Sequence, residues 1–284
     1  MSEIEISNKQ LDLAKIETLL NTNWLGRSTN EFWSVIDSTN TRAIELARRD
    51  AAHGALVIAS EQTAGRGRSG NAWLSPAHSG LYMSFIIRPR IAMAGLPVIT
   101  LATGVAVVQA IQSCLGIKVG LKWVNDLIAD GKKVGGILAE YTNSRDKQKS
   151  DENNSGALII GIGLNLYKPQ INLPLELDNK IGFLANSLNQ NSINKNLLVA
   201  SIANELERVV EEMQSDQLQS LLNAWRVYSV TLGEEIVTNI GDKQIKGQAL
   251  DISEGGELIV KTPTGKISLV AGEVSIRKPG GMYI

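Results

Sequence analysis

The chain has little of what marks secreted, membrane or nucleic-acid-binding proteins. Its 284 residues include one cysteine, Cys114, which excludes an internal disulfide. There are 28 Lys and Arg against 29 Asp and Glu, so no net field favours nucleic acid or a membrane surface, and three phenylalanines make a poor base-stacking platform. The polar start MSEIEISNKQ is unlike a signal peptide, and no apolar run approaches the roughly 20 residues that span a bilayer. These absences predict a soluble, cytoplasmic protein.

The sequence does have an apolar fraction of 43%, enough for a core, and one segment in which arginine alternates with glycine. This segment, SEQTAGRGRSGNAWLSP at residues 60–76, lies between apolar runs that predict strands at 56–60 and 79–89. Glycine permits close backbone approach, and the guanidinium fork of arginine suits phosphate and carboxylate oxygens. The pattern predicts a loop that closes over an anion, while an RNA-binding tail is an equally common use of such a composition.

A polar cluster marks the end of an earlier predicted strand. Residues 32–40, FWSVIDSTN, alternate and then end in Asp37, Ser38, Thr39 and Asn40, after which helical periodicity begins. One interpretation is that Ser38 or Thr39 merely caps the helix. The other is that the remaining hydroxyl and amide groups face a small polar ligand.

The middle of the chain predicts a buried helix at 97–116, with Cys114 as a core residue, followed by strands. We expect one strand to end at Trp123, a second segment to reach Asp130, and a turn at Asp130-Gly131 to lead into a third strand. A polar, mobile tip is predicted at 143–156 and a strongly apolar strand at 157–166. The strand ends carry Lys122, Asn125, Asp126 and Lys133, and Gly135-Gly136 leaves a strip against which a flat ring can lie.

The ends of the chain differ in character. Residues 8–22 predict one short amphipathic helix, and residues 196–229 predict one or two more. From Thr231 onward, short alternating segments separated by glycine predict a small antiparallel barrel or sandwich. We therefore expect a main domain at 1–230 and a second domain at 231–284.

Four motifs together resemble one known family. DSTN, GRGRSGNAWLSP, KWVNDL followed by GKKVGGILAE, and GIGLNL occur in the order and spacing of the biotin protein ligases, and the resemblance extends from about Phe32 to Ile276. It implies an α+β fold of the class II aminoacyl-tRNA synthetase kind: a mixed sheet with helices on one face, then a small SH3-like barrel. Regulators of this family carry an N-terminal winged helix-turn-helix. With one candidate helix before the first motif, we expect a monofunctional ligase.

The resemblance implies an ATP-dependent, AMP-forming biotin–[acetyl-CoA-carboxylase] ligase. Such an enzyme joins biotin to ATP as biotinyl-5′-AMP and then transfers biotin to a lysine of the biotin carboxyl carrier protein. The resemblance implies that the enzyme requires ATP and Mg²⁺, with biotin as its substrate. No DNA or membrane partner is implied, and a homodimer is compatible with the sequence.

Matching positions carry the family's site residues over to this chain. Those expected to bind biotin are Ser38, Thr39, Asn40, Gln62, Arg66, Gly67, Arg68, Lys133, Gly135 and Gly136. The nucleotide would be bound by Arg68, Trp73, Asn125, Lys133 and Asn165. Asp126 would be associated with magnesium, and the catalytic charges would come from Lys133, Arg66 and Arg68.

The sequence departs from the family pattern at three positions and leaves two alternatives. Ser69 and Asn71 stand where relatives often have basic residues, and Val124 replaces a common proline. A lipoate or octanoate ligase on a related fold would need an apolar tunnel in place of a polar clamp. A non-catalytic nucleic-acid binder would use the arginine loop and the C-terminal barrel, against which the near-neutral charge argues.

Overall fold

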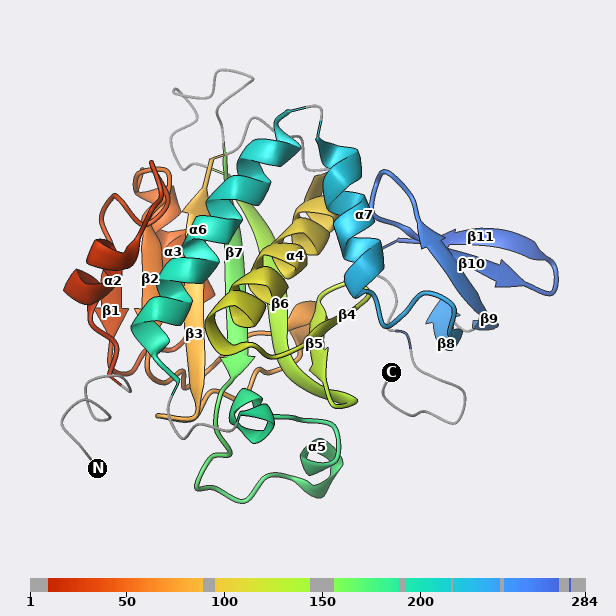
Figure 1. The fold of residues 1–284 in the computed structure, drawn as a ribbon, viewed down its shortest axis with the longest axis horizontal. Helices are drawn as coiled ribbons and strands as arrows, with labels where there is room; N and C mark the ends of the chain where they lie inside the picture. Colours follow the sequence, from red (N-terminus) through yellow and green to blue (C-terminus); the bar gives the residue numbers. More distant parts are fainter. Residues whose placement is uncertain are drawn as a thin grey trace.

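The computed structural model describes residues 10–88, 95–143, 156–188, 193–215, 217–240, 243–270 and residue 276. A seven-stranded sheet is packed with helices, and a smaller sheet lies beside it (Figure 1). The large sheet has the order β1-β2-β3-β7-β6-β5-β4, with bounds β1 Glu31–Trp33, β2 Leu56–Ala59, β3 Gly80–Ile87, β4 Gly120–Lys122, β5 Asp126–Ala129, β6 Lys132–Asn143 and β7 Gly156–Asn165. The helices are α2 Leu13–Leu19, α3 Thr39–Arg48, α4 Leu96–Leu115, α5 Leu175–Asp178, α6 Lys195–Met213 and α7 Leu218–Tyr228.

The large sheet is mixed, as the resemblance implied. β1 and β2 run parallel, and the other neighbouring pairs are antiparallel. The predicted turn at Asp130-Gly131 is confirmed, with φ of 49° and 71° at the two residues, as a tight hairpin turn requires. In the β6–β7 hairpin, Gly136 lies directly opposite Gly163. The tip predicted at 143–156 falls, except for its two end residues, outside the described part of the chain.

Helices cover both faces of the large sheet. α4 and α6 cross one face (Figure 1), where they pack on residues such as Leu56 and Phe85. α3 packs on the opposite face, against Val57 and Ile86. The expectation of helices on one face is therefore wrong for α3. The reason is that β2 and β3 are buried at consecutive positions, so both of their faces need a cover.

The α4 helix is the centre of the core. Among the described residues it is the one helix long and apolar enough to cross a membrane, so the expectation that no run reaches that length is wrong. However, 72% of its most apolar 18-residue stretch is buried inside the protein, which identifies it as a core helix. A proline in its first turn and Gly116 in the left-handed region (φ 68°) bound it, as predicted. Cys114 lies partly buried on it and donates to Ser201 Oγ of α6.

The N-terminal helix is shorter than predicted, because Asp12 caps it and the backbone at Leu20 is already extended. The chain after it is fastened to α6. Both carboxylate oxygens of Glu207 accept hydrogen bonds from the backbone N–H groups of residues 23–25 at 2.6 to 2.9 Å. This carboxylate is buried, so it ties the N-terminal segment to the core.

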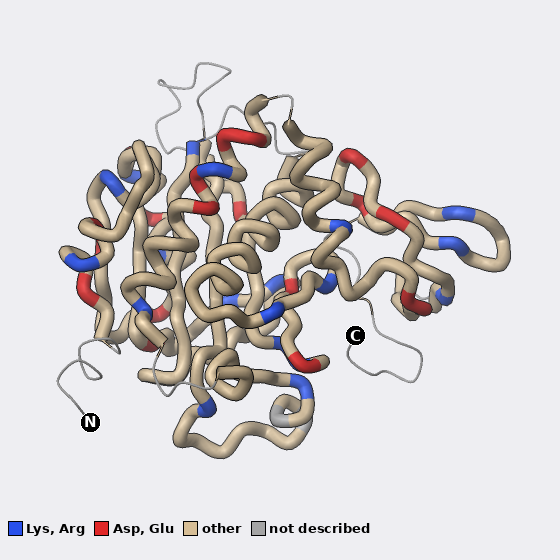
Figure 2. The backbone as a smooth tube through the Cα atoms, viewed as in Figure 1, with Lys and Arg blue, Asp and Glu red and all other residues tan. Residues whose placement is uncertain are grey.

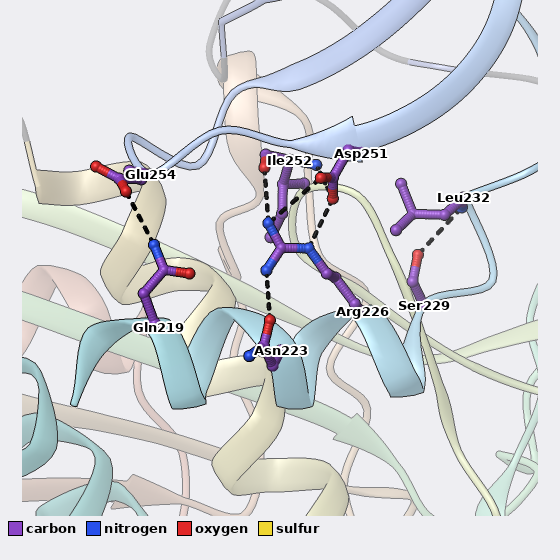
Figure 3. A network of polar contacts seen from close by, with 8 residues as sticks. All are labelled: Gln219, Asn223, Arg226, Ser229, Leu232, Asp251, Ile252 and Glu254. Atoms are coloured by element: carbon purple, nitrogen blue, oxygen red, sulfur yellow. Dashed lines mark hydrogen bonds and ion pairs between the residues drawn. The ribbon is translucent and has the colours of Figure 1, made fainter.

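The predicted C-terminal β domain is present as a four-stranded antiparallel sheet of order β11-β10-β9-β8, with bounds β8 Glu235–Ile240, β9 Lys243–Ile252, β10 Leu258–Thr262 and β11 Gly265–Leu269. Figure 3 shows how α7 holds it. Arg226 donates to the Asp251 carboxylate at 2.7 Å and to the Ile252 carbonyl at 3.1 Å, and Gln219 donates to Glu254 at 3.0 Å. These bonds join α7 to the C-terminal sheet, whose buried apolar residues such as Ile252 and Leu258 belong to the same hydrophobic cluster as the main core.

Charges of the two signs alternate along the described chain (Figure 2). Lys and Arg lie among Asp and Glu on the helices and on the C-terminal sheet alike. This distribution agrees with the near-neutral composition of the chain.

Candidate functional site

A cleft of about 830 Å³ opens where the start of α3, the arginine–glycine loop (residues 60–76), β6, β7 and the segment around α5 meet. Its volume suits a small-molecule ligand. Of the site residues that the resemblance implied, all but Gly135 line it: Ser38, Thr39, Asn40, Gln62, Arg66, Gly67, Arg68, Trp73, Asn125, Asp126, Lys133, Gly136 and Asn165. Asp37 and Lys122, which the sequence placed at a helix start and a strand end, do not line it. The separate motifs therefore converge on one cavity.

The arginine–glycine loop is ordered as a short ladder. Arg66 and Ala72 form an antiparallel bridge, and the N–H of Trp73 donates to the Gly65 carbonyl at 2.8 Å. A Cβ at Gly65 would lie 2.3 Å from the Trp73 carbonyl oxygen, so the ladder requires glycine there. This pairing fixes the direction in which the loop presents its arginines.

Both arginines of the loop line the cleft, and Arg68 is the less exposed of the two. Its Nη1 donates to Asn125 Oδ1 at 3.1 Å, and Asn125 is itself held by donating to the Ile137 carbonyl at 2.9 Å. Its Nη2 is buried and has no hydrogen-bond partner among the described residues. Burial lowers the pKa of the Arg68 guanidinium, and the nearby charge of Asp126 opposes that shift. A buried cation with a free donor is suited to an anionic ligand.

Trp73 lies on the glycine strip of the sheet. A Cβ at Gly163 would lie 2.5 Å from the indole Nε1, and one at Gly136 would lie 3.3 Å from the far edge of the ring. The flat ring that fits this strip is thus one of the protein's own side chains. Its Nε1 is buried without a hydrogen-bond partner among the described residues, and Lys133 Nζ lies 5.1 Å from the ring centroid. The indole is therefore a second cleft-lining group with a donor that has no partner among the described residues.

Lys133 forms an ion pair with Asp126, which holds its ammonium group at the cleft. Asn165 donates to the Lys133 carbonyl at 3.3 Å. In the described part of the chain no three His, Cys, Asp or Glu residues cluster to hold a metal. A lone carboxylate such as Asp126 suits Mg²⁺ that arrives on phosphate oxygens, since Mg²⁺ commonly binds through one or two carboxylates plus substrate phosphates.

The polar residues at the start of α3 line the cleft and also make hydrogen bonds within the protein. Ser38 is the N-cap residue, as one interpretation predicted. The N–H of Thr39 donates to Gln62 Oε1 at 2.8 Å. Asn40 is buried, and its amide group donates to Glu140 at 2.9 Å and accepts from Ser84 Oγ at 2.6 Å. Asn40 is therefore committed to protein partners on both sides of its amide.

Gly135 faces away from the cleft, which corrects its assignment as a biotin-binding residue. A Cβ there would lie 2.7 Å from Leu164 and 3.0 Å from Leu127, two core residues on the α4 side. Successive strand residues point to opposite faces, so only Gly136 of this pair contributes to the ligand side.

The sequence did not reveal a further group of lining residues, Leu177, Lys180 and Ile181. Their segment is joined to β6 through the backbone: Lys133 N–H donates to the Lys180 carbonyl, and Gly182 N–H donates to the Lys133 carbonyl, both at 2.8 Å. No motif marks this segment, which follows Pro174 between the predicted strand at 157–166 and the predicted helices at 196–229.

Comparison with known proteins agrees with this geometry. The biotin/lipoate A/B protein ligase family matches residues 32–165, and the biotin protein ligase C-terminal domain matches residues 231–277. The bifunctional ligase/repressor BirA of Bacillus spizizenii is 33% identical, over 86% of this chain and 73% of its own length. This chain belongs to the biotin protein ligase family. The biotin–[acetyl-CoA-carboxylase] ligase of Paracoccus denitrificans is 27% identical, over 84% of this chain and 96% of its own length.

Solved structures of biotin protein ligases share the fold. The Aquifex aeolicus ligase in complex with biotin and ATP matches with a TM-score of 0.75 and 27% identity, over 88% of this chain and 99% of that one. The Leishmania major ligase in complex with biotinyl-5-AMP matches with a TM-score of 0.56 and 25% identity, over 86% of this chain and 99% of that one. The predictions of a biotin–protein ligase and of an α+β fold with a C-terminal β domain are confirmed.

Proposed function

We propose that this ligase forms biotinyl-5′-AMP from biotin and ATP and transfers biotin to a lysine of the biotin carboxyl carrier protein of acetyl-CoA carboxylase. The observation that carries the proposal is the pair of buried, unpartnered donors, Arg68 Nη2 and Trp73 Nε1, which share the cleft with Lys133. A buried donor without an acceptor costs free energy that a ligand's oxygens recover. The relatives crystallised with biotin and ATP, and with biotinyl-5-AMP, support this choice of ligand.

In the first step a carboxylate oxygen of biotin attacks the α-phosphorus of ATP. The bond between that phosphorus and the bridging oxygen breaks, and pyrophosphate leaves. Both reactants are anions, so the reaction needs positive charge at the meeting point, which we assign to Lys133 and Arg68. Arg66, which the resemblance also implied, is ion-paired with Glu140 and contributes by holding the loop that carries Arg68. Mg²⁺ accompanies ATP as part of the substrate and supplies further charge neutralisation, and Asp126 is the carboxylate that would hold it.

The remaining lining residues divide between the two substrates. The hydroxyl and amide groups at the α3 end of the cleft suit the polar head group of biotin, with glycine allowing close approach: Ser38, Thr39, Asn40, Gln62, Gly67 and Gly136. The aromatic and amide groups beside Lys133 suit the nucleotide: Trp73, Asn125 and Asn165. Since the Asn40 amide already has protein partners, we assign it to holding the neighbouring polar groups of Thr39 and Gln62 in place for biotin.

In the second step the ε-amine of the acceptor lysine attacks the acyl carbon of the adenylate. The bond from that carbon to the phosphate oxygen breaks, AMP leaves with the electron pair, and the amine loses a proton. The ordinary pKa of a lysine is about 10.4, so a group in the cleft must favour the neutral amine. Asp126 is the candidate acceptor of the proton. Closure of the arginine–glycine loop would shield the anhydride from water.

Biotin is favoured over lipoate or octanoate by the polar clamp of Thr39 and Gln62 and by the match to the biotin protein ligase C-terminal domain. The test is ATP–pyrophosphate exchange by the purified protein with Mg²⁺ and either biotin, lipoate or no acid. We expect exchange with biotin alone. Exchange with lipoate alone would overturn the substrate, and no exchange by folded protein would overturn the chemistry.

We further place the domain division at residues 230/231 and the protein in the cytoplasm. The first is supported by the C-terminal family match, which starts at residue 231. The second is supported by the burial of α4 in the core and by the near-neutral charge.

A further inference from the structure

Glu140, on β6 beyond the lining of the cleft, joins the arginine–glycine loop to α3. One of its carboxylate oxygens accepts from Arg66 Nη2 at 2.6 Å, and the other accepts from Asn40 Nδ2 at 2.9 Å. The Glu140 side chain is 22% exposed and Asn40 is buried. The Glu140 carboxylate is therefore held by the buried Asn40 amide through one oxygen and binds Arg66 of the loop through the other.

The contacts continue from Asn40 back to the loop. Ser84 Oγ donates to Asn40 Oδ1 at 2.6 Å and lies 2.8 Å from Thr39 Oγ1. The N–H of Thr39 donates to Gln62 Oε1 at 2.8 Å, and Gln62 Nε2 donates to Ser75 Oγ at 2.8 Å. A continuous polar chain thus leaves one arm of the loop at Arg66 and returns to the other arm at Ser75.

The loop tip, residues 65–71, has two side-chain hydrogen bonds to the rest of the described protein. One is Arg66 to Glu140, and the other is Arg68 to Asn125. Arg68 lines the cleft, and its Nη2 has no hydrogen-bond partner among the described residues, so its guanidinium keeps a donor for a ligand. The Arg66 contact is the one that can hold the tip whether or not the cleft is filled.

We propose that Glu140 is a positioning residue that holds the arginine–glycine loop closed over the cleft by pairing with Arg66. This inference rests on the proposed function only for the identity of the ligand under the loop, biotinyl-5′-AMP. The role of the Glu140–Arg66 pair does not depend on it. A charge-assisted bond is about twice as strong as a neutral one, so removal of the charge opens the loop more often without removing the acceptor for the Asn40 amide.

The test compares Glu140→Gln with Glu31→Gln in the full chain. The side-chain amide introduced by Glu140→Gln can still accept from Asn40, so the substitution weakens the Arg66 arm selectively. Glu31 is a matched control because it pairs with Arg42 at 2.8 Å, has a side chain 20% exposed, and lies outside the cleft lining. Trypsin is added to the ligand-free proteins, and cleavage after Arg66 and Arg68 is followed by mass spectrometry. Release of biotinyl-5′-AMP from loaded protein is followed separately.

We expect Glu140→Gln to raise loop cleavage and adenylate release roughly five-fold, about 1 kcal/mol in the closing equilibrium, with Glu31→Gln unchanged in both. Glu140→Asp keeps the charge on a shorter side chain, so its loop cleavage and adenylate release should lie between those of the wild type and Glu140→Gln. It replaces Glu140→Gln in the comparison if that variant does not fold. Equal cleavage in Glu140→Gln and Glu31→Gln overturns the proposal. If the wild type makes no adenylate, the proposed function fails, but the cleavage comparison still decides the role of Glu140.

Discussion

Replacing Gly163 by alanine should displace Trp73 and impair use of ATP. The added Cβ would lie 2.5 Å from the indole Nε1 and 2.6 Å from its Cε2, whereas ordinary contacts begin near 3.4 Å. The indole must therefore move by about 1 Å, and misplacement on that scale costs about 100-fold in rate. Overpacking of this kind also costs ~1–3 kcal/mol of stability. We expect kcat/KM for ATP in pyrophosphate exchange to fall about 100-fold, with a smaller effect on the KM for biotin.

Gly135→Ala is the matched control. Its Cβ would be equally crowded, 2.7 Å from Leu164, but on the core side of the same strand pair. We expect it to lower the urea midpoint by a similar amount while kcat/KM for ATP stays within about three-fold of the wild type. If Gly163→Ala folds and uses ATP as well as Gly135→Ala does, the position of the indole does not matter to the nucleotide, and the role assigned to Trp73 is wrong.

Three further predictions concern charge. Lys133→Ala should reduce exchange about 10²- to 10³-fold while the Kd for biotin, from equilibrium dialysis, changes little; equal losses in both would contradict its assignment to the phosphoryl step. Glu207→Ala leaves the N–H groups of residues 23–25 without their acceptor and should cost ~3 kcal/mol or more in urea unfolding, whereas Glu207→Gln, which keeps an acceptor, should cost less. Burial lowers the pKa of Lys195 from 10.5 to about 8, so between these values the unfolded chain binds more protons and stability rises with pH. The stability of the wild type relative to Lys195→Met should therefore increase from pH 8 to pH 10.5; a constant difference would show that the amine titrates normally.

Much of the fold could be predicted because its strands and core helix have strong local signals. The apolar run that became α4, the Asp130-Gly131 turn and the glycine-separated C-terminal strands each carry their own periodicity or turn residues. The cleft was predictable for a different reason. Most of its polar lining residues belong to four short motifs that lie at or near the end of a strand or the start of a helix, so the fold gathers them at one place.

What the sequence could not reveal depends on contacts between distant residues. Arg66 and Glu140 are 74 positions apart, and Asn40 and Glu140 are 100 apart. Neither pair has a local pattern, because each is created by the order of strands in the sheet. The difference between Gly135 and Gly136 has the same origin. The strand register decides which of the two faces the cleft, and two consecutive glycines have no side-chain pattern from which the register could be predicted.

The C-terminal domain is connected to the cleft through Trp123, although none of its described residues lines the cavity. The backbone N–H of Trp123 donates to Thr231 Oγ1 at 2.9 Å, and its indole N–H donates to the Gly256 carbonyl at 3.0 Å. Two residues further along, Asn125 accepts from Arg68. The segment 123–125 is thus held at one end by the C-terminal domain and at the other by Arg68 of the cleft lining. Because these contacts are contiguous, we expect a movement of the C-terminal sheet that keeps the bonds to Trp123 to shift Asn125, which supports Arg68.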